Sequence, residues 1–190
     1  GQLEAALGSI NSVAANFAVE AGDIIKAIQR TGGVFATASK GVSEGIGALQ
    51  EFIAVFTSVR ATTRESAETI ATGLRTIFTR IQRGSTIEAL KEFGVTLTDA
   101  EGKFVGAYRA IGLLAEGLRS IDPRDVRFSQ IVEELGGFRQ IGKVIHWKSM
   151  LLSGWHLLLN AHAGHLVRGY QLQLALPWVS RGNNVIQIFT

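Results

Sequence analysis

Apolar residues recur at three- and four-residue intervals through most of the first 145 residues, and this spacing constrains the fold more than any other feature of the sequence. Residues at that spacing share one face of an α-helix, so each stripe predicts an amphipathic helix that must bury one face against a partner. The clearest stripe lies within 67–81, and others lie within 24–35, 46–59 and 128–145. We therefore predict an all-α fold in which several amphipathic helices form a compact helical bundle.

Two of these stripes, within 67–81 and 128–145, are the surfaces expected to carry folding or self-association. Packing within one chain is the ordinary interpretation of such a stripe, and association between copies is the other. Both interpretations stay open on the sequence alone. The candidate packing and self-association residues are Ile70, Leu74, Ile77, Phe78, Ile81, Phe128, Ile131, Leu135, Phe138 and Ile141.

Three local signals predict where helices begin. Thr62-x-x-Glu65 and Ser85-x-x-Glu88 match the capping box, in which a hydroxyl and a carboxylate satisfy each other's free backbone N–H groups. Asp122 followed by Pro123 offers a capping acceptor and a proline suited to the first helical position. Helices are therefore expected to begin at these three places.

One segment, 94–105, departs from helical periodicity. Val95 and Leu97 precede the polar stretch 98–102, and Phe104 and Val105 follow it, which predicts a short β-hairpin-like turn between helices. The acids of this stretch lack the D-x-[DN]-x-[DN]-G spacing of a calcium loop. A solvated turn is therefore preferred to a metal site.

The stretch 137–143 reads G-x-x-x-x-G-K, the pattern of a nucleotide-phosphate loop. Such a loop follows a buried strand and needs Ser or Thr after the Lys to hold Mg²⁺. Position 144 is Val, and the residues before the glycines have helical spacing. The glycines are therefore interpreted as a break between helical segments, and no cofactor is expected.

The composition changes abruptly after Ile145. All four His, all three Trp and the single Met follow it, whereas all 16 Asp and Glu precede it. Of the 19 Lys and Arg, only Lys148, Arg168 and Arg181 lie beyond it, so the net charge of +3 belongs to the C-terminal segment. We therefore treat 1–145 as one helical domain and 146–190 as an unrelated Trp-, His- and Leu-rich segment, fused or frame-shifted. Because the domain is neutral, no specific nucleic-acid binding is expected of it.

The first 145 residues offer little for catalysis. The chain has no Cys and this part has no His, which excludes a Cys nucleophile, a thiolate zinc site and a His base there. No catalytic, metal-binding or cofactor-binding residue is expected, and the chain is not expected to be an enzyme. Surface ion pairs with Glu65 and Glu68 are preferred to phosphate contacts for five arginines. These are Arg60, Arg64, Arg75, Arg80 and Arg83.

The C-terminal segment supports an alternative function. His162 and His165 share the spacing of one helical face, but no carboxylate accompanies them and a zinc site is not predicted. The Leu and Trp residues with basic flanks suit a membrane interface. The alternative is a small helical membrane-active or toxin-like protein acting through this segment, the only part expected to contact membranes. Liposome co-sedimentation of 1–145 and 1–190 separates the two functions, because the alternative needs the segment for lipid binding.

Four blocks occur in order within the first 145 residues: AIQRTGGVFA at 27–36, TTRESAETIATGLRTIFTRIQR at 62–83, GVTLTDAEGKF at 94–104 and EELGGFRQIGKVI at 133–145. With these blocks the chain resembles the core region of phage and prophage tail tape measure proteins. The resemblance covers essentially all of 1–145. In that family the GGFRQIGK block is not a nucleotide site.

The resemblance implies structural work in the virion tail. Tape measure proteins are long, mostly helical chains that occupy the lumen of the growing tail tube, set the tail length, and leave with the DNA at infection. The implied partners are the tube protein, the tail tip, tail-assembly chaperones and further copies of the chain, with the host cytoplasm as the place of assembly. Even one continuous helix of 190 residues would span only about 285 Å, so a portion of a tape is expected.

The resemblance does not obviously continue past Ile145. The next three residues, His146–Lys148, written CAC-TGG-AAG and read with a one-base shift after a preceding C, become Pro-Leu-Glu, which suits the family better. This frameshift hypothesis predicts that the neighbouring reading frame encodes a charged, helical continuation. Its absence from the coding DNA would remove the hypothesis.

Overall fold

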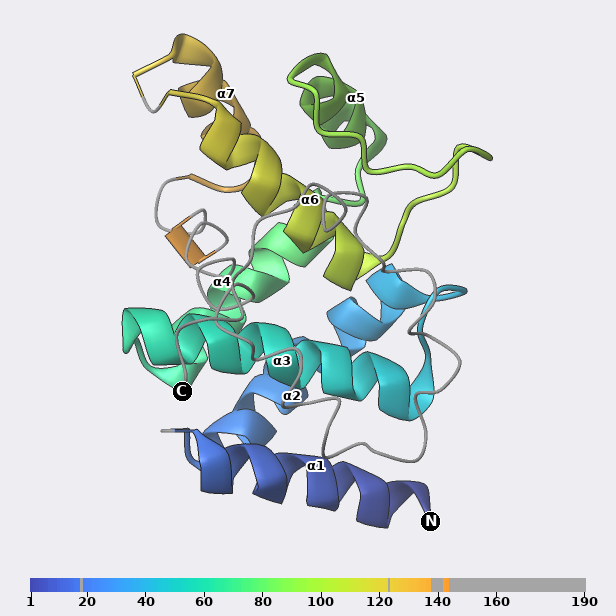
Figure 1. Cartoon of the computed structure of the whole chain (residues 1–190), viewed down its shortest axis with the longest axis vertical. Helices are drawn as coiled ribbons and strands as arrows, with labels where there is room; N and C mark the ends of the chain where they lie inside the picture. The colour runs from blue at the N-terminus through green and yellow to red at the C-terminus, as the bar shows by residue number, and fades with distance from the viewer. Residues whose placement is uncertain (18, 123, 138–141, 144–190) are drawn as a thin grey trace, which may run out of the picture. The chain divides into compact units, whose positions relative to one another are not determined.

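The computed structural model describes residues 1–17, 19–122, 124–137 and 142–143, all within one compact unit (Figure 1). These residues form seven helices and no strand, which confirms the predicted all-α fold. Pro123 and the predicted boundary at residue 146, with the histidines and tryptophans beyond it, lie outside the described residues. The helices are α1 (Gln2–Asn16), α2 (Ala21–Ser39), α3 (Gly45–Thr63), α4 (Ala67–Arg80), α5 (Gly84–Glu92), α6 (Ala107–Ser120) and α7 (Val126–Glu134).

Helices α2 and α4 share the most extensive contact between helices. Lys26 lies opposite Glu68, and Phe35 lies opposite Phe78 further along both helices, so α2 and α4 run parallel. Between these two contacts, the fully buried hydroxyl of Thr31 donates to a backbone carbonyl of α4 at 2.7 Å. This bond satisfies a polar group that would otherwise be costly to bury, and it fixes how far α2 is advanced along α4.

Helix α3 packs against the same pair in the opposite direction. The first turn of α2 meets the last turn of α3 through Asp23 and Arg60, whereas Phe35 near the end of α2 meets Phe52 in the first half of α3. Phe35 contacts Phe52 and Phe78 edge to face, with ring centroids 5.5 and 5.0 Å apart. The three rings are buried, so one aromatic side chain of α2 connects the cores of α3 and α4.

The predicted start of α4 at Thr62 is wrong. Thr62 belongs to the last turn of α3, and its hydroxyl donates to the carbonyl four residues back instead of capping a new helix. Helix α3 ends at Thr63, and its C-cap Arg64 has a left-handed φ of 57°. The cap of α4 is Ser66, whose Oγ accepts the backbone N–H of Thr69 at 3.2 Å. The predicted capping box does not form because Thr62, its first residue, still belongs to α3.

The other two predicted helix starts are also misplaced. Helix α5 already begins at Gly84, so the predicted cap Ser85 lies inside its first turn, and α5 has no side-chain cap. The cap of α7 is Asp125, whose carboxylate accepts the N–H of Arg127 at 2.9 Å. Asp122 accepts a backbone N–H two residues on and closes the turn before the helix instead.

The segment 94–105 forms the predicted hairpin-like turn. Thr98 and Phe104 make an isolated antiparallel bridge. The Oδ1 atom of Asp99 accepts the backbone N–H groups of Glu101 at 3.1 Å and of Lys103 at 2.7 Å. The carboxylate therefore stabilises the turn through two backbone hydrogen bonds.

Helix α6 was not predicted from the apolar stripes, and neither was α1. The buried face of α6 is Ala107, Ala110, Ile111, Leu114, Ala115 and Leu118. Half of this face is alanine, which weakens the hydrophobic signal while leaving the helical period intact. Close packing follows from the small residues: an added Cβ on Gly117 would lie 2.1 Å from Cγ2 of Val95.

The predicted helix break at the two glycines is confirmed. Helix α7 ends at Glu134, and Gly136 and Gly137 have φ values of 110° and 91°. The N–H of Gly137 donates to the carbonyl of Val132 at 2.7 Å and so closes the last turn. Glycine adopts these left-handed angles without the strain that a side chain would add.

Candidate functional site

The structure buries the predicted packing residues within the chain's own core. Their exposed fraction is at most 5%, and two further candidates, Phe138 and Ile141, lie outside the described residues. In the folded chain these side chains are already partnered, so self-association through them stays a prediction that requires the core to open. The buried candidates are Ile70, Leu74, Ile77, Phe78, Ile81, Phe128, Ile131 and Leu135.

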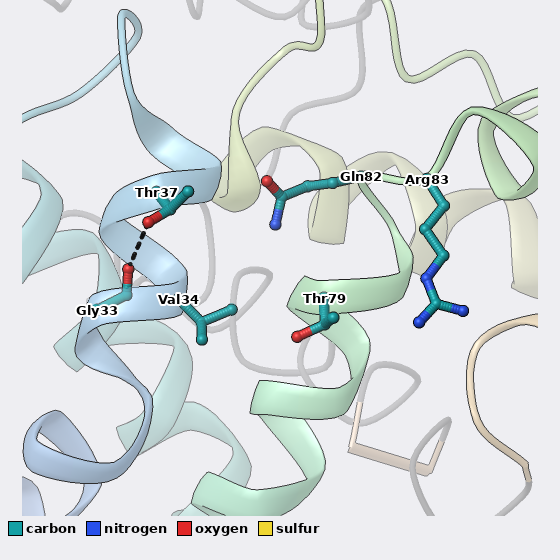
Figure 2. A pocket seen from close by; sticks show the side chains of 6 residues that line it. All are labelled: Gly33, Val34, Thr37, Thr79, Gln82 and Arg83. Atoms are coloured by element: carbon teal, nitrogen blue, oxygen red, sulfur yellow. Dashed lines mark hydrogen bonds between the residues drawn. The ribbon is translucent and has the colours of Figure 1, made fainter.

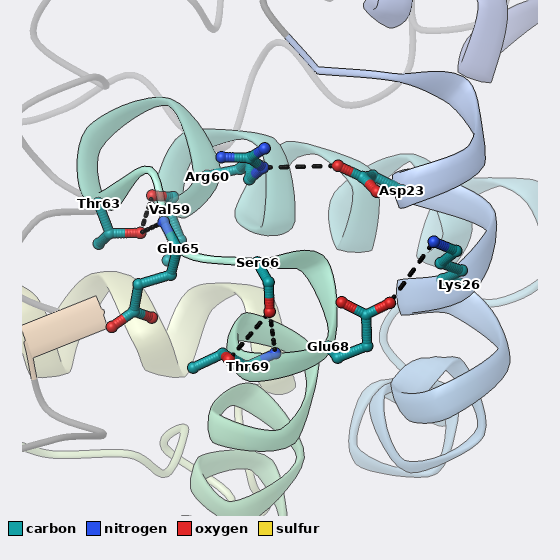
Figure 3. A network of polar contacts seen from close by, with 9 residues as sticks. All are labelled: Asp23, Lys26, Val59, Arg60, Thr63, Glu65, Ser66, Glu68 and Thr69. Carbon is teal, nitrogen blue, oxygen red and sulfur yellow. Dashed lines mark hydrogen bonds and ion pairs between the residues drawn. The ribbon is translucent and has the colours of Figure 1, made fainter.

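Two ion pairs join α2 to its neighbours at the surface (Figure 3). Asp23 lies 3.6 Å from Arg60 of α3, and Lys26 lies 3.5 Å from Glu68 of α4. A backbone N–H and the nearby Lys26 lower the pKa of Glu68. The predicted ion pairing of Arg60 therefore occurs, but its partner is an acid of α2 rather than one of the two glutamates close to it in sequence. The Lys26–Glu68 pair is exposed and adds little stability, whereas the side chains of Asp23 and Arg60 are only 19% and 26% exposed.

Lys143, the lysine of the G-x-x-x-x-G-K pattern, is buried and its Nζ lies 2.9 Å from Glu65 Oε2. The two charges meet at ion-pair distance, although the geometry is not that of a hydrogen bond. Glu65 lies in the connection between α3 and α4 (Figure 3). The lysine therefore faces a carboxylate of its own chain, which agrees with the interpretation of this stretch as structural.

Arg80 connects α4 to the end of α7. Its Nη1 donates to the backbone carbonyls of Glu133 and Glu134, at 3.1 and 3.2 Å. These carbonyls are in the last turn of α7, where the helix dipole is negative. The Glu133 carbonyl also accepts the backbone N–H of Gly136 at 3.1 Å. The buried hydroxyl of Thr86 adds a bond to the Glu134 carboxylate at 3.3 Å. Arg80 thus stabilises the C-terminal end of α7, more than 50 residues further along the chain.

Arg80→Ala is expected to lower the free energy of unfolding by about 1 kcal/mol, because both carbonyls lose the hydrogen bond from Arg80 and the end of α7 loses its favourable charge. Amide hydrogen exchange within α7 should accelerate more than exchange within α2. Arg75→Ala, an exposed change on the same helix, is the control and should stay within about 0.5 kcal/mol of the native chain. Equal effects of the two substitutions would contradict the role assigned to Arg80.

Glu51 of α3 and Tyr108 of α6 form a partly buried titratable pair. Burial raises the pKa of Glu51, and a hydrogen bond from Ser43 partly offsets this. Burial and the Glu51 carboxylate raise the pKa of Tyr108 to about 12. Because the folded chain favours the protonated carboxyl, stability should fall as the pH rises from 4.5, the ordinary value, through the raised value.

Glu51→Gln should therefore increase the free energy of unfolding at pH 7, because the amide can keep the Ser43 bond without a buried charge. The gain should disappear at about pH 4, where the native carboxyl is protonated in both states. Urea unfolding at the two pH values measures both effects. Glu88→Gln, on the exposed surface of α5, should change stability by less than about 0.5 kcal/mol at either pH. A destabilised Glu51→Gln chain at pH 7 would refute this explanation.

An open groove of about 380 Å³ lies between the C-terminal parts of α2 and α4 (Figure 2). It exists because the two helices run parallel and because Gly33 contributes no side chain on the α2 side. Figure 2 shows Val34 and Thr37 of α2 on one side of the groove, with Thr79 of α4 and the following Gln82 on the other. The lining residues are Gly33, Val34 and Thr37 on one side and Thr79, Gln82 and Arg83 on the other.

The chain was compared with known protein families and solved structures. A family model described as phage-related minor tail protein matches residues 1–137. The chain belongs to the phage-related minor tail protein family. The match spans all seven helices and the groove, so these features belong to the family region. No solved structure matches the chain.

As a phage-related minor tail protein, the chain is a structural component of a phage tail and interacts with other tail components. None of the helices in the described ranges is long and apolar enough to cross a membrane. Across those same ranges, no group of three or more His, Asp and Glu side chains is placed to hold a metal ion.

Two features of this minor tail protein were missed in the sequence analysis. Arg80 was assigned to a surface ion pair because its backbone partners are distant in sequence. The groove was missed because it depends on the parallel alignment of α2 and α4. The adjacent glycines at 32 and 33 were the one local signal for it, since glycine inside a helical pattern often marks a close approach or a packing gap.

Proposed function

We propose that the chain is a segment of a tail tape measure protein, which sets tail length during assembly and lies in the tube lumen until it leaves with the DNA. The observation that carries the proposal is the family match over residues 1–137. Four sequence blocks that resemble tape measure proteins lie in order within 1–145, and the described part of the chain is all helical. The role we propose is structural and not enzymatic.

The fold indicates how such a segment contributes to length. The longest helices have 19 residues and so span about 28 Å each, and α3 runs back along α2. In this folded form the segment adds a fixed, short unit to a tape rather than an extended rod. We therefore propose templating by the total length of a longer chain, with helix-mediated contacts between copies.

The proposed partners follow from this location. They are the tube protein that surrounds the lumen, the tail tip, the tail-assembly chaperones and further copies of the chain. The two surface ion pairs and the α2–α4 groove supply polar and apolar contacts of the kind that such partners need.

Quantitative mass spectrometry of purified virions tests the proposed location. Particles are compared before and after DNA ejection is triggered in vitro, and the tube protein serves as the internal reference because it stays with the particle. The chain should be present in intact virions and depleted from the ejected particles. Equal amounts of the chain in the two preparations would contradict a lumen location and favour a fixed tail component.

A further inference from the structure

The polar side chains that line the α2–α4 groove are, with one exception, already hydrogen-bonded to a backbone carbonyl of α2 or α4. The hydroxyl of Thr37 donates to the carbonyl of Gly33 at 2.9 Å, and that of Thr79 donates to a carbonyl of α4 at 2.8 Å. The amide of Gln82 also donates to a backbone carbonyl of α4. Because these donors are already used, the groove offers fewer free polar groups than its sequence suggests.

Arg83 is the exception. Its side chain forms no hydrogen bond or ion pair with the residues that the structure describes. Arg83 belongs to the groove lining, and in Figure 2 its guanidinium lies beside α4, on the side away from Val34 and Thr37. At the opposite side, no atom lies within 4 Å of the position that a Cβ of Gly33 would occupy. The groove therefore has room for an incoming apolar side chain and an unpaired cation beside it.

The exposed edge of α1 has the complementary character. Leu3 and Leu7 are one helical turn apart and are 73% and 46% exposed, which is unusual for large apolar side chains. Glu4 lies on the same edge with its side chain 86% exposed, and it contacts the terminal amine of Gly1. Pairs this exposed are weak, so the carboxylate can exchange this partner for another cation.

Charge separates this edge from the other exposed apolar positions on helices. Ile25 and Val126 are also exposed, but each is followed directly by a cation, Lys26 or Arg127. A cation placed in the groove would face Arg83, and like charges across a contact are unfavourable. Acids also lie near both positions, but Asp23 is paired with Arg60, and Asp125 caps α7 and is paired with Arg127. Among the exposed apolar helix positions that the structure describes, only the α1 edge has a neighbouring acid that is not paired with a cationic side chain.

We propose that the α2–α4 groove of one copy binds the α1 edge of a second copy, with Leu3 and Leu7 in the groove and Glu4 paired with Arg83. The two surfaces differ, so the contact is head-to-tail and can extend into a ring or an open chain of copies. The proposal deepens the self-association included in the proposed function and names the surfaces that carry it. Glu4 and Arg83 fix which copies recognise each other, because like charges there would repel.

Charge reversal tests this contact, with sedimentation velocity of the full chain over a range of concentrations as the measurement. The native chain should self-associate as its concentration rises. Glu4→Lys and Arg83→Glu each place like charges at the contact and should weaken association at least about tenfold. The double variant restores opposite charges in exchanged positions and should recover association close to the native level. Both positions are exposed, so the variants are expected to fold, which circular dichroism checks.

A matched apolar control distinguishes binding through the proposed α1 edge from non-specific hydrophobic association. Leu7→Ser should weaken association, whereas Val126→Ser, which removes a more exposed apolar side chain on α7, should leave it unchanged. A native chain that stays monomeric, or a double variant that is no better than the single ones, would overturn the proposal. Either result leaves tail length and lumen location untouched, so the proposed function can stand when this contact fails.

Discussion

Phe35→Ala is expected to lower the free energy of unfolding by about 3–5 kcal/mol, the range for removing a buried aromatic side chain. Phe35 is 1% exposed and contacts rings of both α3 and α4, so its loss leaves a cavity where three helices meet. Because the buried Thr31 hydrogen bond fixes the position of α2 along α4, the neighbours cannot close the gap cheaply. Urea unfolding followed by far-ultraviolet circular dichroism measures the loss.

The control for this prediction is Ile25→Ala on the same helix. Ile25 is 40% exposed, so its truncation removes fewer contacts and should cost well under half as much. In a chain of this size, the Phe35 substitution should also lower the melting temperature by roughly 6–20 °C. A cost below about 1 kcal/mol would show that the three rings do not organise the core.

Gly117→Ala is expected to destabilise the chain by about 1–3 kcal/mol, although alanine normally stabilises a helix relative to glycine. The new methyl carbon would lie 2.1 Å from Cγ2 of Val95, far inside contact distance. Val95 is 2% exposed and β-branched, so it has little freedom to turn away from the methyl. The helix α6 must shift away from the 94–105 turn, or the turn must deform.

Two further substitutions isolate the clash from helix propensity. Gly8→Ala, in the middle of α1 where nothing lies within 4 Å of the added carbon, should stabilise the chain by about 0.5–1 kcal/mol. Val95→Ala combined with Gly117→Ala should lower the free energy of unfolding by less than the sum of the two single changes, because the methyl group added at position 117 then has room. Stabilisation by Gly117→Ala alone would disprove the close approach.

The helices that the sequence predicted best are those whose stripes contain large aliphatic and aromatic residues. The stripe within 67–81 became α4, and its Ile, Leu and Phe side chains are buried as the period required. Helix α6 has the same period, but alanines make up half of its buried face and its cap is Gly106, which offers no side-chain signal. The helical spacing alone would have predicted α6 if alanine had been counted among the apolar residues.

Helix ends were predicted poorly because a capping pattern is only local. Thr62 and Glu65 have the spacing of a capping box, yet α3 continues through Thr62 because its apolar face remains buried against α2 and α4. Ser66 then caps α4 with a single bond. Tertiary packing decided between two neighbouring hydroxyls that the sequence presents as nearly equivalent.

The candidate surfaces lay beyond sequence reasoning for a related reason. Arg80 acts on carbonyls 53 and 54 residues away, and Lys143 meets Glu65 across the fold. The groove needs α2 and α4 to be parallel, which only the folded chain specifies. Sequence reasoning identified the buried residues and the type of protein, but the residues that remain available to partners required the structure.

Tail length in a phage that carries this gene tests the central claim most directly. An in-frame tandem duplication of residues 1–137 adds one folded unit to the tape, and negative-stain electron microscopy then measures tail length over many particles. If the segment is part of a tape measure, the duplication should lengthen the tail by one constant step, and a second duplication should add the same step again. Tails of unchanged length with the duplicated chain present in the virion would contradict the claim.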